Sequence, residues 1–226
     1  LGWVGLITAA IAAPEWQGFA DFRTGVRTQP DDHEPDAILG ESRFQIWGEH
    51  REEWGTLTLR SDFLYDAIPR HSSLDLETGH GPVDLREANV LFSPAADMDV
   101  KVGRQILTWG VGDLLFINDL FPKDWNSFFC GRDTDYLKAP SDAALMSFYS
   151  GALNVDVVYT PRFDPDRFID GDRISYWSPA DGRRAGRDRI VDPDRPEEWF
   201  QQDEWAGRLR GTGMGLEWAV YAYDGY

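Results

Sequence analysis

The sequence predicts an all-β fold, an antiparallel transmembrane β-barrel of which about nine strands lie within these 226 residues. Two observations predict this fold. Segments of alternating apolar and polar residues recur along the chain, and the connections between them are alternately short and long. This alternation is typical of barrels in the bacterial outer membrane, where tight turns face the periplasm and long loops face the outside.

The connections keep this order along the chain. The short ones cover residues 50–53, 93–97, 150–152 and 213–215, and the long ones cover residues 28–40, 66–82, 106–140 and 164–203. If the N-terminus is periplasmic, the long connections are extracellular loops, and residues 164–203 are exposed outside the cell.

Residues 1–13 are uncharged and apolar, and Ala10, Ala12 and Ala13 have the small-residue spacing of a signal-peptidase site. The stretch is shorter than the roughly 20 residues that a membrane-spanning helix needs. We interpret it as a partial signal peptide, with residues 14–226 as a single barrel domain. A buried strand or helix of the mature domain is the alternative.

The first three expected strands, residues 18–27, 42–49 and 55–65, each separate apolar from charged side chains. The third is the clearest. Its two faces read Gly55, Leu57, Leu59, Ser61, Phe63 and Tyr65 against Thr56, Thr58, Arg60 and Asp62.

The later strands follow the same alternation, although residues 142–149 show it least clearly. The expected segments are residues 83–92, 98–105, 142–149, 153–160, 205–210 and 216–223. Because the count is odd and Leu216–Tyr223 would run toward the outside, we expect the chain to be a C-terminally truncated fragment. Its first and ninth strands would then be unpaired edges of a curved sheet.

The polar face of these strands carries charges of both signs, as expected for a water-filled lumen. The inward set is Asp21, Arg23, Arg43, Glu49, Arg60, Asp62, Glu87, Lys101, Asp156, Arg208, Arg210 and Glu217. Such a lining would create a transverse field across a pore. A salt-bridged plug that only stabilises the barrel is the equally weighted alternative.

Composition excludes some classes of function. The net charge of −17 makes nucleic acid an unfavourable partner, since the phosphate backbone would be repelled. The single Cys130 supports neither a disulfide framework nor a zinc site. Aromatic residues make up 14% of the chain, which suits the aromatic girdles of a barrel and would also suit a carbohydrate-binding sandwich.

The segment after the fifth strand is the most distinctive. It reads Gly103-Arg104-Gln105-Ile106-Leu107-Thr108-Trp109-Gly110-Val111-Gly112-Asp113, followed by Asn118-Asp119-Leu120-Phe121-Pro122-Lys123-Asp124-Trp125. This stretch, with Leu85-Arg86-Glu87-Ala88 and Leu216-Glu217-Trp218-Ala219-Val220-Tyr221, resembles a group of porin-like outer-membrane proteins of Gram-negative bacteria. The resemblance implies a porin-like barrel and says little about the solute.

The residues themselves suggest how this segment is arranged. Gly103, Gly110 and Gly112 allow the chain to leave the wall and fold inward. Arg104 could then pin the excursion by pairing with Asp113 or Asp119. We therefore expect a constriction loop inside the barrel, with an outward cap or helical lid as the alternative. The predicted pore-lining or constriction residues are Arg43, Arg60, Asp62, Glu87, Lys101, Arg104, Gln105, Trp109, Asp113, Asp119, Arg208 and Arg210.

No enzyme is predicted. His33, His50, His71 and His80 have no metal-ligand spacing, and the neighbours His71 and Ser72 do not make a triad. Residues 164–172 are rich in Asp but lack the ligand spacing of an EF-hand. We expect neither cofactor nor resident metal, and weak divalent-ion binding there would be structural.

Three functions fit the sequence. The first is an outer-membrane channel for passive or solute-selective diffusion of an unidentified small solute. The second is a structural barrel or scaffold of an export or electron-conduit complex, and the third is a soluble periplasmic β-sandwich that binds glycans. The expected partners are outer-membrane lipid and lipopolysaccharide, with a second copy or a periplasmic protein as further candidates.

Overall fold

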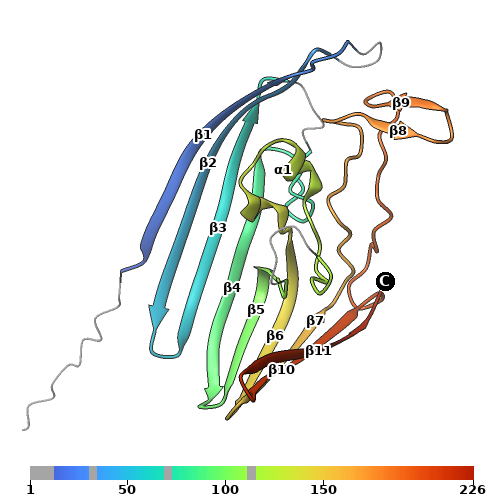
Figure 1. Ribbon diagram of the computed structural model, residues 1–226. Coiled ribbons are helices and arrows are strands. Elements are labelled where there is room, and N and C mark those ends of the chain that lie inside the picture. Colours follow the sequence, from blue (N-terminus) through green and yellow to red (C-terminus); the bar gives the residue numbers. More distant parts are fainter. Residues whose placement is uncertain (1–12, 31–34, 69–72, 111–115) are drawn as a thin grey trace, which may run out of the picture.

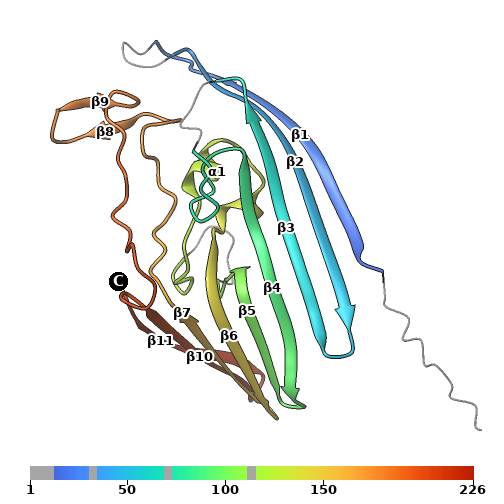
Figure 2. The same cartoon turned by 180° about the vertical axis from the view of Figure 1, so that it is seen from behind.

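A nine-stranded antiparallel sheet forms the body of the molecule. The computed structural model describes residues 13–30, 35–68, 73–110 and 116–226, and in this part each strand of the sheet pairs with the next in sequence order (Figures 1 and 2). The strands are β1 (Glu15–Val26), β2 (Ala37–Glu52), β3 (Gly55–Asp66), β4 (Val83–Ala95), β5 (Met98–Ile106), β6 (Pro140–Ser150), β7 (Leu153–Thr160), β10 (Glu204–Gly213) and β11 (Leu216–Asp224).

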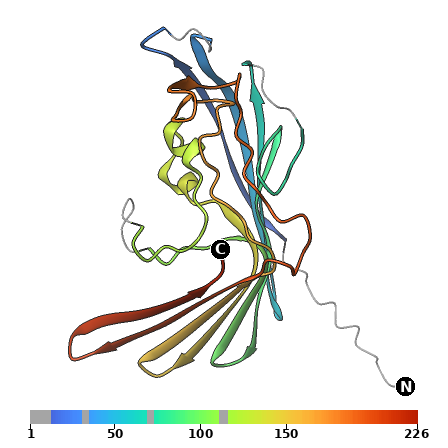
Figure 3. The same cartoon turned by 90° about the vertical axis from the view of Figure 1, so that its right-hand side faces the viewer.

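The all-β class, the antiparallel order and the number of strands agree with the prediction from the sequence. The sheet is curved but open, with β1 and β11 as its two edges in the described part (Figure 3). A closed barrel is therefore not present among the described residues, and closure and membrane insertion stay predictions. The expected signal peptide covers residues 1–13, and all of it except Ala13 lies outside the described residues.

One face of the sheet is apolar and exposed. On β3, the side chains of Leu57, Leu59, Phe63 and Tyr65 are between 42% and 69% exposed. The same face continues on other strands with Phe22, Phe44, Val102, Phe148, Val155, Leu209 and Val220. This distribution is the reverse of that in a soluble protein, whose sheets turn their apolar face toward a core.

The opposite face is polar and buried. Arg43, Asp62 and Arg86 are each at most 2% exposed, although all three carry charge. The chain between β5 and β6, which includes α1 (Trp125–Phe129) and the 3₁₀ helix η1 (Thr134–Leu137), lies on one side of the sheet (Figure 3). A hydrogen bond from Gln45 of β2 to the Tyr136 hydroxyl of η1 shows that this side is the polar one. We call the polar side the inner face and the apolar side the outer face.

The hydrophobic core is small and lies on the inner face. It consists of Leu107, Trp109, Phe121, Ala143, Val158 and Ala206. Three of these residues belong to the β5–β6 connection and three to β6, β7 and β10. The core therefore fastens the start of the connection to one half of the sheet.

The long connection between β7 and β10 contains structure that the sequence did not predict. Instead of a purely solvated loop, it forms a two-stranded hairpin of β8 (Tyr176–Ser178) and β9 (Arg183–Ala185). Figure 1 shows this hairpin beyond the end of the sheet where the long connections lie. Each strand has only three residues, too few for an alternating pattern to be recognised.

The helical segments of the described residues are short. None of them is long and apolar enough to cross a membrane.

Gly103 marks the point where β5 separates from β4. Its φ is +115°, and an added Cβ would lie 2.4 Å from the carbonyl oxygen of Ala88. The ladder between the two strands ends at the next pair, Ala88 with Arg104. Only glycine fits this conformation without strain.

We predict that Gly103→Ala lowers the free energy of unfolding by about 2 kcal/mol or more, because a side chain would clash with the neighbouring strand. Equilibrium urea unfolding measures this change. The control is Gly207→Ala, since nothing lies within 4 Å of a Cβ at Gly207 in β10. If both substitutions lowered the free energy of unfolding equally, the claim that only glycine fits at position 103 would be contradicted.

Candidate functional site

Tyr136 in η1 is the centre of the contact between the β5–β6 connection and the wall. Its side chain is buried, and its hydroxyl accepts a hydrogen bond from Gln45 Nε2 at 2.6 Å. The guanidinium carbons of Arg43 and Arg86 lie 4.3 and 4.7 Å from its ring centre. The ring thus interacts with two cations from β2 and β4.

The charges of β2 and β3 around this ring are paired along the wall. Arg43 donates to Glu41 at 2.6 Å and lies 3.5 Å from the Asp62 carboxylate. Gln45 donates to the other oxygen of Asp62 at 2.6 Å. Since all four side chains are buried, these bonds replace the water that the charges would otherwise need.

Glu41 also binds arginines from the two longest connections, β5–β6 and β7–β10. Arg132 donates to it at 2.7 Å and Arg173 at 2.8 Å. Burial is the largest single influence and lowers the pKa of Arg132, but the charges of Glu41, Asp124 and Asp84 and the hydrogen bond to Glu41 together outweigh it, and the pKa lies above its ordinary value. Arg132 therefore stays charged beneath the surface. Arg173 bonds in addition to Asp66 at 2.9 Å.

A second group of ions joins β4 to the same two connections. Arg167 lies 3.2 Å from Asp84 and 3.5 Å from Asp124, and Asp84 also lies 3.6 Å from Arg86. Asp124 is the N-cap of α1 and accepts bonds from the backbone and hydroxyl of Ser127, both at 2.7 Å. The Asp124 carboxylate thus caps the N-terminus of α1 and also pairs with Arg167.

These contacts form one buried ion network, defined here as Glu41, Arg43, Gln45, Asp62, Asp84, Arg86, Asp124, Arg132, Tyr136, Arg167 and Arg173. Its members come from three strands and both long connections. Buried ion pairs gain little over apolar packing, but removing one partner leaves an unpaired charge and costs about 3–5 kcal/mol. The network therefore fixes the connections in one arrangement on the inner face.

The start of the β5–β6 connection lies against the other half of the sheet. The Trp109 ring centre is 5.9 Å from that of Tyr221 in β11, and the Arg208 guanidinium of β10 lies 5.1 Å from the Trp109 ring. Trp109 also makes an edge-to-face contact with Phe121 at 5.0 Å. The described part of residues 106–140 thus folds onto the inner face, in the direction that the sequence predicts.

Arg104 lies within the wall rather than over the inner face. Beyond the end of the β4–β5 ladder, it donates to the carbonyl oxygens of Leu85 and Glu77, both at 2.6 Å. It also donates to the Asp142 carboxylate of β6 at 3.0 Å. The guanidinium therefore fills the split between β4 and β5 and holds the neighbouring loop.

The predicted pairing of Arg104 with Asp119 is wrong. Asp119 accepts instead from the Thr108 hydroxyl at 3.1 Å and from the Trp109 N–H at 3.2 Å, and it lies 3.3 Å from the Lys123 ammonium. These bonds close the β5–β6 connection on itself. Asp113, the other predicted partner, lies outside the described residues.

The part of the inner face nearer the short turns is only half-buried. There Glu87 lies 4.0 Å from Arg60 and 3.7 Å from Lys101, which links β3, β4 and β5. On the other half of the sheet, Asp156 accepts from Arg208 at 2.6 Å and from Ser147 at 2.7 Å. We call these two sets the charged ladder.

The predicted lining residues thus fall into two groups. Arg43, Asp62, Arg104, Gln105, Trp109 and Asp119 are buried, whereas Arg60, Glu87, Lys101 and Arg208 are half-buried and Arg210 is exposed. A role in lining a water-filled space fits the second group. The members of the first group are covered and do not face open solvent in the structure.

Sequence reasoning missed several members of the buried ion network. Glu41 lies one residue before the expected strand 42–49, so a slightly longer strand would have included it. Asp84 and Arg86 lie within the expected strand 83–92, but regular alternation puts them on the side of Ala88, and the register shift between β3 and β4 at Arg60/Ser61 breaks that alternation. Asp124, Arg132, Tyr136, Arg167 and Arg173 lie in irregular connections, where no periodic pattern marks a buried side chain.

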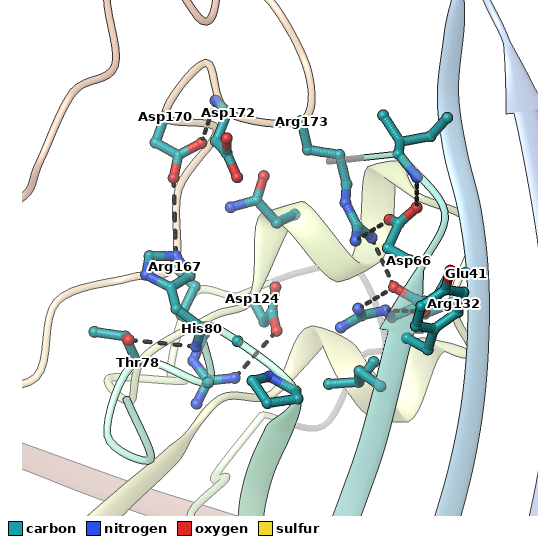
Figure 4. Close-up of a pocket in the computed structure, with 17 residues that line it drawn as sticks. Glu41, Asp66, Thr78, His80, Asp124, Arg132, Arg167, Asp170, Asp172 and Arg173 are labelled. Carbon is teal, nitrogen blue, oxygen red and sulfur yellow. Dashed lines mark hydrogen bonds and ion pairs between the residues drawn. The ribbon is translucent and has the colours of Figure 1, made fainter. Parts of the chain in front are cut away.

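A cavity of about 510 Å³ opens where the long connections meet the sheet (Figure 4). Charged residues of both signs line it, among them Glu41, Asp66, His80, Asp124, Arg132, Arg167, Asp170, Asp172 and Arg173. The three arginines that line the cavity, Arg132, Arg167 and Arg173, all belong to the buried ion network. The cavity therefore borders that network.

No group of three or more His, Cys, Asp or Glu side chains in the described ranges could hold a metal ion. Comparisons with known proteins gave no match to a family model and no match to a curated protein.

We predict that Tyr136→Ala lowers the free energy of unfolding by about 3–5 kcal/mol, because a large buried ring is lost between two arginines. Tyr136→Phe should cost about 1–2 kcal/mol for the lost hydroxyl bond. Urea unfolding and proteolysis within residues 116–139 measure both. The control is Tyr149→Phe, whose hydroxyl bonds to Asp99 on an exposed part of β6. If Tyr136→Ala were as mild as the control, the central role of Tyr136 would be refuted.

Proposed function

We propose that this chain forms the wall of an outer-membrane channel for passive or solute-selective diffusion. The observation that carries the proposal is the reversed sheet, with an exposed apolar face and charged side chains on the other face. Lipid solvates the first and water or protein the second, as in barrels that cross a membrane with strands.

The strand lengths support a membrane wall. A tilted strand needs about 9–11 residues to cross the hydrocarbon layer. Strands β1, β3, β5 and β10 have 12, 12, 9 and 10 residues. Eight of the nine strands of the sheet thus have at least 9 residues, and β7, with 8, is slightly shorter.

Aromatic residues near both ends of the strands support the same orientation. Trp16 and Trp218 lie toward the short turns, and Tyr65 and Trp205 lie toward the long connections; all four are at least 42% exposed. Aromatic side chains prefer the two interfaces of a membrane. A soluble sandwich would instead bury this face, which weighs against the glycan-binding alternative.

The charged ladder is the part of the inner face suited to conduct solute. Apart from the buried Asp156, its charged side chains are half-buried, and they are paired across the strands, so they offer water-accessible charge of both signs. The buried ion network and the β5–β6 connection cover the other part. In this proposal, the buried ion network and the β5–β6 connection narrow the water-filled channel at the end of the sheet where the long connections lie.

A structural barrel is the second candidate, and the buried ion network favours it. If the connections fill the whole passage, the charges serve only to hold them, and the protein would conduct little. The assignment to the outer membrane is common to both candidates, so conductance separates them.

The first test is detergent fractionation followed by planar-bilayer recording. The channel proposal expects the protein in the detergent phase and stepwise conductance, and Lys101→Glu should shift the reversal potential toward cation selectivity. Arg51→Glu is the matched charge reversal at the β2–β3 turn, where the side chain is 64% exposed. Membrane partition without conductance would support the structural barrel instead, and partition into the aqueous phase would refute both.

The second test concerns sidedness. An epitope inserted at Asp181, in the turn of the β8–β9 hairpin, should be labelled by antibody on intact cells. An epitope in the β4–β5 turn near Asp97 should be labelled only after permeabilisation. The opposite pattern would invert the proposed topology, and labelling of neither on any membrane fraction would oppose an outer-membrane location.

A further inference from the structure

A second cavity, of about 500 Å³, lies next to the one in Figure 4 and shares part of its wall. Thr78, His80, Asn126, Arg167 and Asp170 line both. The second cavity is enclosed mainly by residues 164–195 of the β7–β10 connection, with α1 and the end of the β5–β6 connection behind it. Its size falls within the range of small-molecule sites.

The cavity exposes aromatic side chains. Phe168 and Trp177 are 63% and 66% exposed and both line it, together with Val191 at 48%. Large rings left this open offer an apolar surface for a ligand. Their π faces also attract cations.

Two carboxylates of the cavity have no cationic side chain to balance them. Asp166 accepts only from the backbone N–H of Lys123 and the indole N–H of Trp125, at 2.8 and 2.9 Å. Asp170 accepts from the backbone N–H of Asp172 at 2.9 Å. In the described part of the chain, neither has a Lys or Arg nitrogen within salt-bridge distance.

The remaining neighbours of Asp170 do not change this balance. Its second oxygen lies 3.9 Å from His80 Nε2, too far for a hydrogen bond, and Figure 4 shows the two side chains facing each other. Nearby, the side-chain oxygen of Asn126 is buried without a hydrogen-bond partner. Asp166 and Asp170 thus offer a ligand two negative charges that no Lys or Arg side chain of the described residues pairs with.

The net charge of the whole chain also favours a cationic ligand. With a net charge of −17, the protein repels anions and concentrates cations at its surface. The two arginines of the cavity are already used, Arg167 by Asp84 and Asp124 and Arg195 by Asp164. In the described part of the chain, an anionic ligand would therefore find no Lys or Arg side chain there that lacks a carboxylate partner.

We propose that this cavity binds an organic cation, with its ammonium group near Asp166 and Asp170 and its apolar part on Phe168 and Trp177. The inference deepens the proposed channel by naming the class of solute that it receives at the end where the long connections lie. Binding itself does not depend on the proposed channel function; only the passage of the bound cation through the channel rests on it.

The experiment is isothermal titration calorimetry on the purified chain in detergent, with choline as the probe. The neutral isostere 3,3-dimethylbutan-1-ol and the anion benzoate are the comparison ligands. Choline should bind at least tenfold more tightly than the alcohol, since only the charge differs, and benzoate should not bind.

Two substitutions locate the site. Asp170→Asn should weaken choline binding about tenfold and leave the alcohol unchanged, and Trp177→Leu should weaken choline about threefold. The matched controls are Asp135→Asn and Trp199→Leu, two exposed residues that do not line the cavity. Circular dichroism checks that each variant is folded.

The proposal is overturned if folded protein fails to bind choline at millimolar concentration, if the alcohol binds as tightly, or if Asp170→Asn acts like Asp135→Asn. These outcomes are independent of the channel test. Conductance without choline binding would refute this inference alone, whereas choline binding without conductance would refute the channel and leave the site standing.

Discussion

The buried ion network is the interaction on which the rest of the structure depends. A sheet with a charged face needs something to satisfy those charges, and here two long connections supply the partners. Arg132 and Arg173 meet at Glu41, and Arg167 joins Asp84 to the helix cap Asp124. Because an unpaired buried charge costs about 3–5 kcal/mol, moving either connection away from these partners would be unfavourable.

That arrangement explains why the apolar core can be small. In a soluble domain, burial of apolar surface supplies most of the stability. In this protein most large apolar side chains of the sheet are on the outer face and exposed, so hydrogen bonds, ion pairs and a few ring contacts hold the inner side. Tyr136 joins both kinds of contact, since its ring lies between two arginines and its hydroxyl accepts from Gln45.

The sheet could be predicted from the sequence because its information is local. Alternation along β3 and the short turns specify the strands, their faces and their order. The site could be predicted only in part. Arg173 and Glu41 are 132 residues apart, and Arg167 and Asp84 are 83 apart, so no local pattern links them. The β8–β9 hairpin was missed because its three-residue strands are too short for an alternating pattern. The expected pairing of Arg104 with Asp119 was wrong because the strand split that Arg104 fills appears only in three dimensions.

The central claim is that the outer face meets lipid and the inner face does not. Nitroxide labels placed one at a time at positions 56–65 of β3, in a Cys130→Ser background reconstituted in bilayers, test it directly. The account predicts that accessibility to oxygen has a period of two, with maxima at positions 57, 59, 61, 63 and 65. High accessibility of those same positions to a water-soluble nickel chelate, with no alternation, would contradict it.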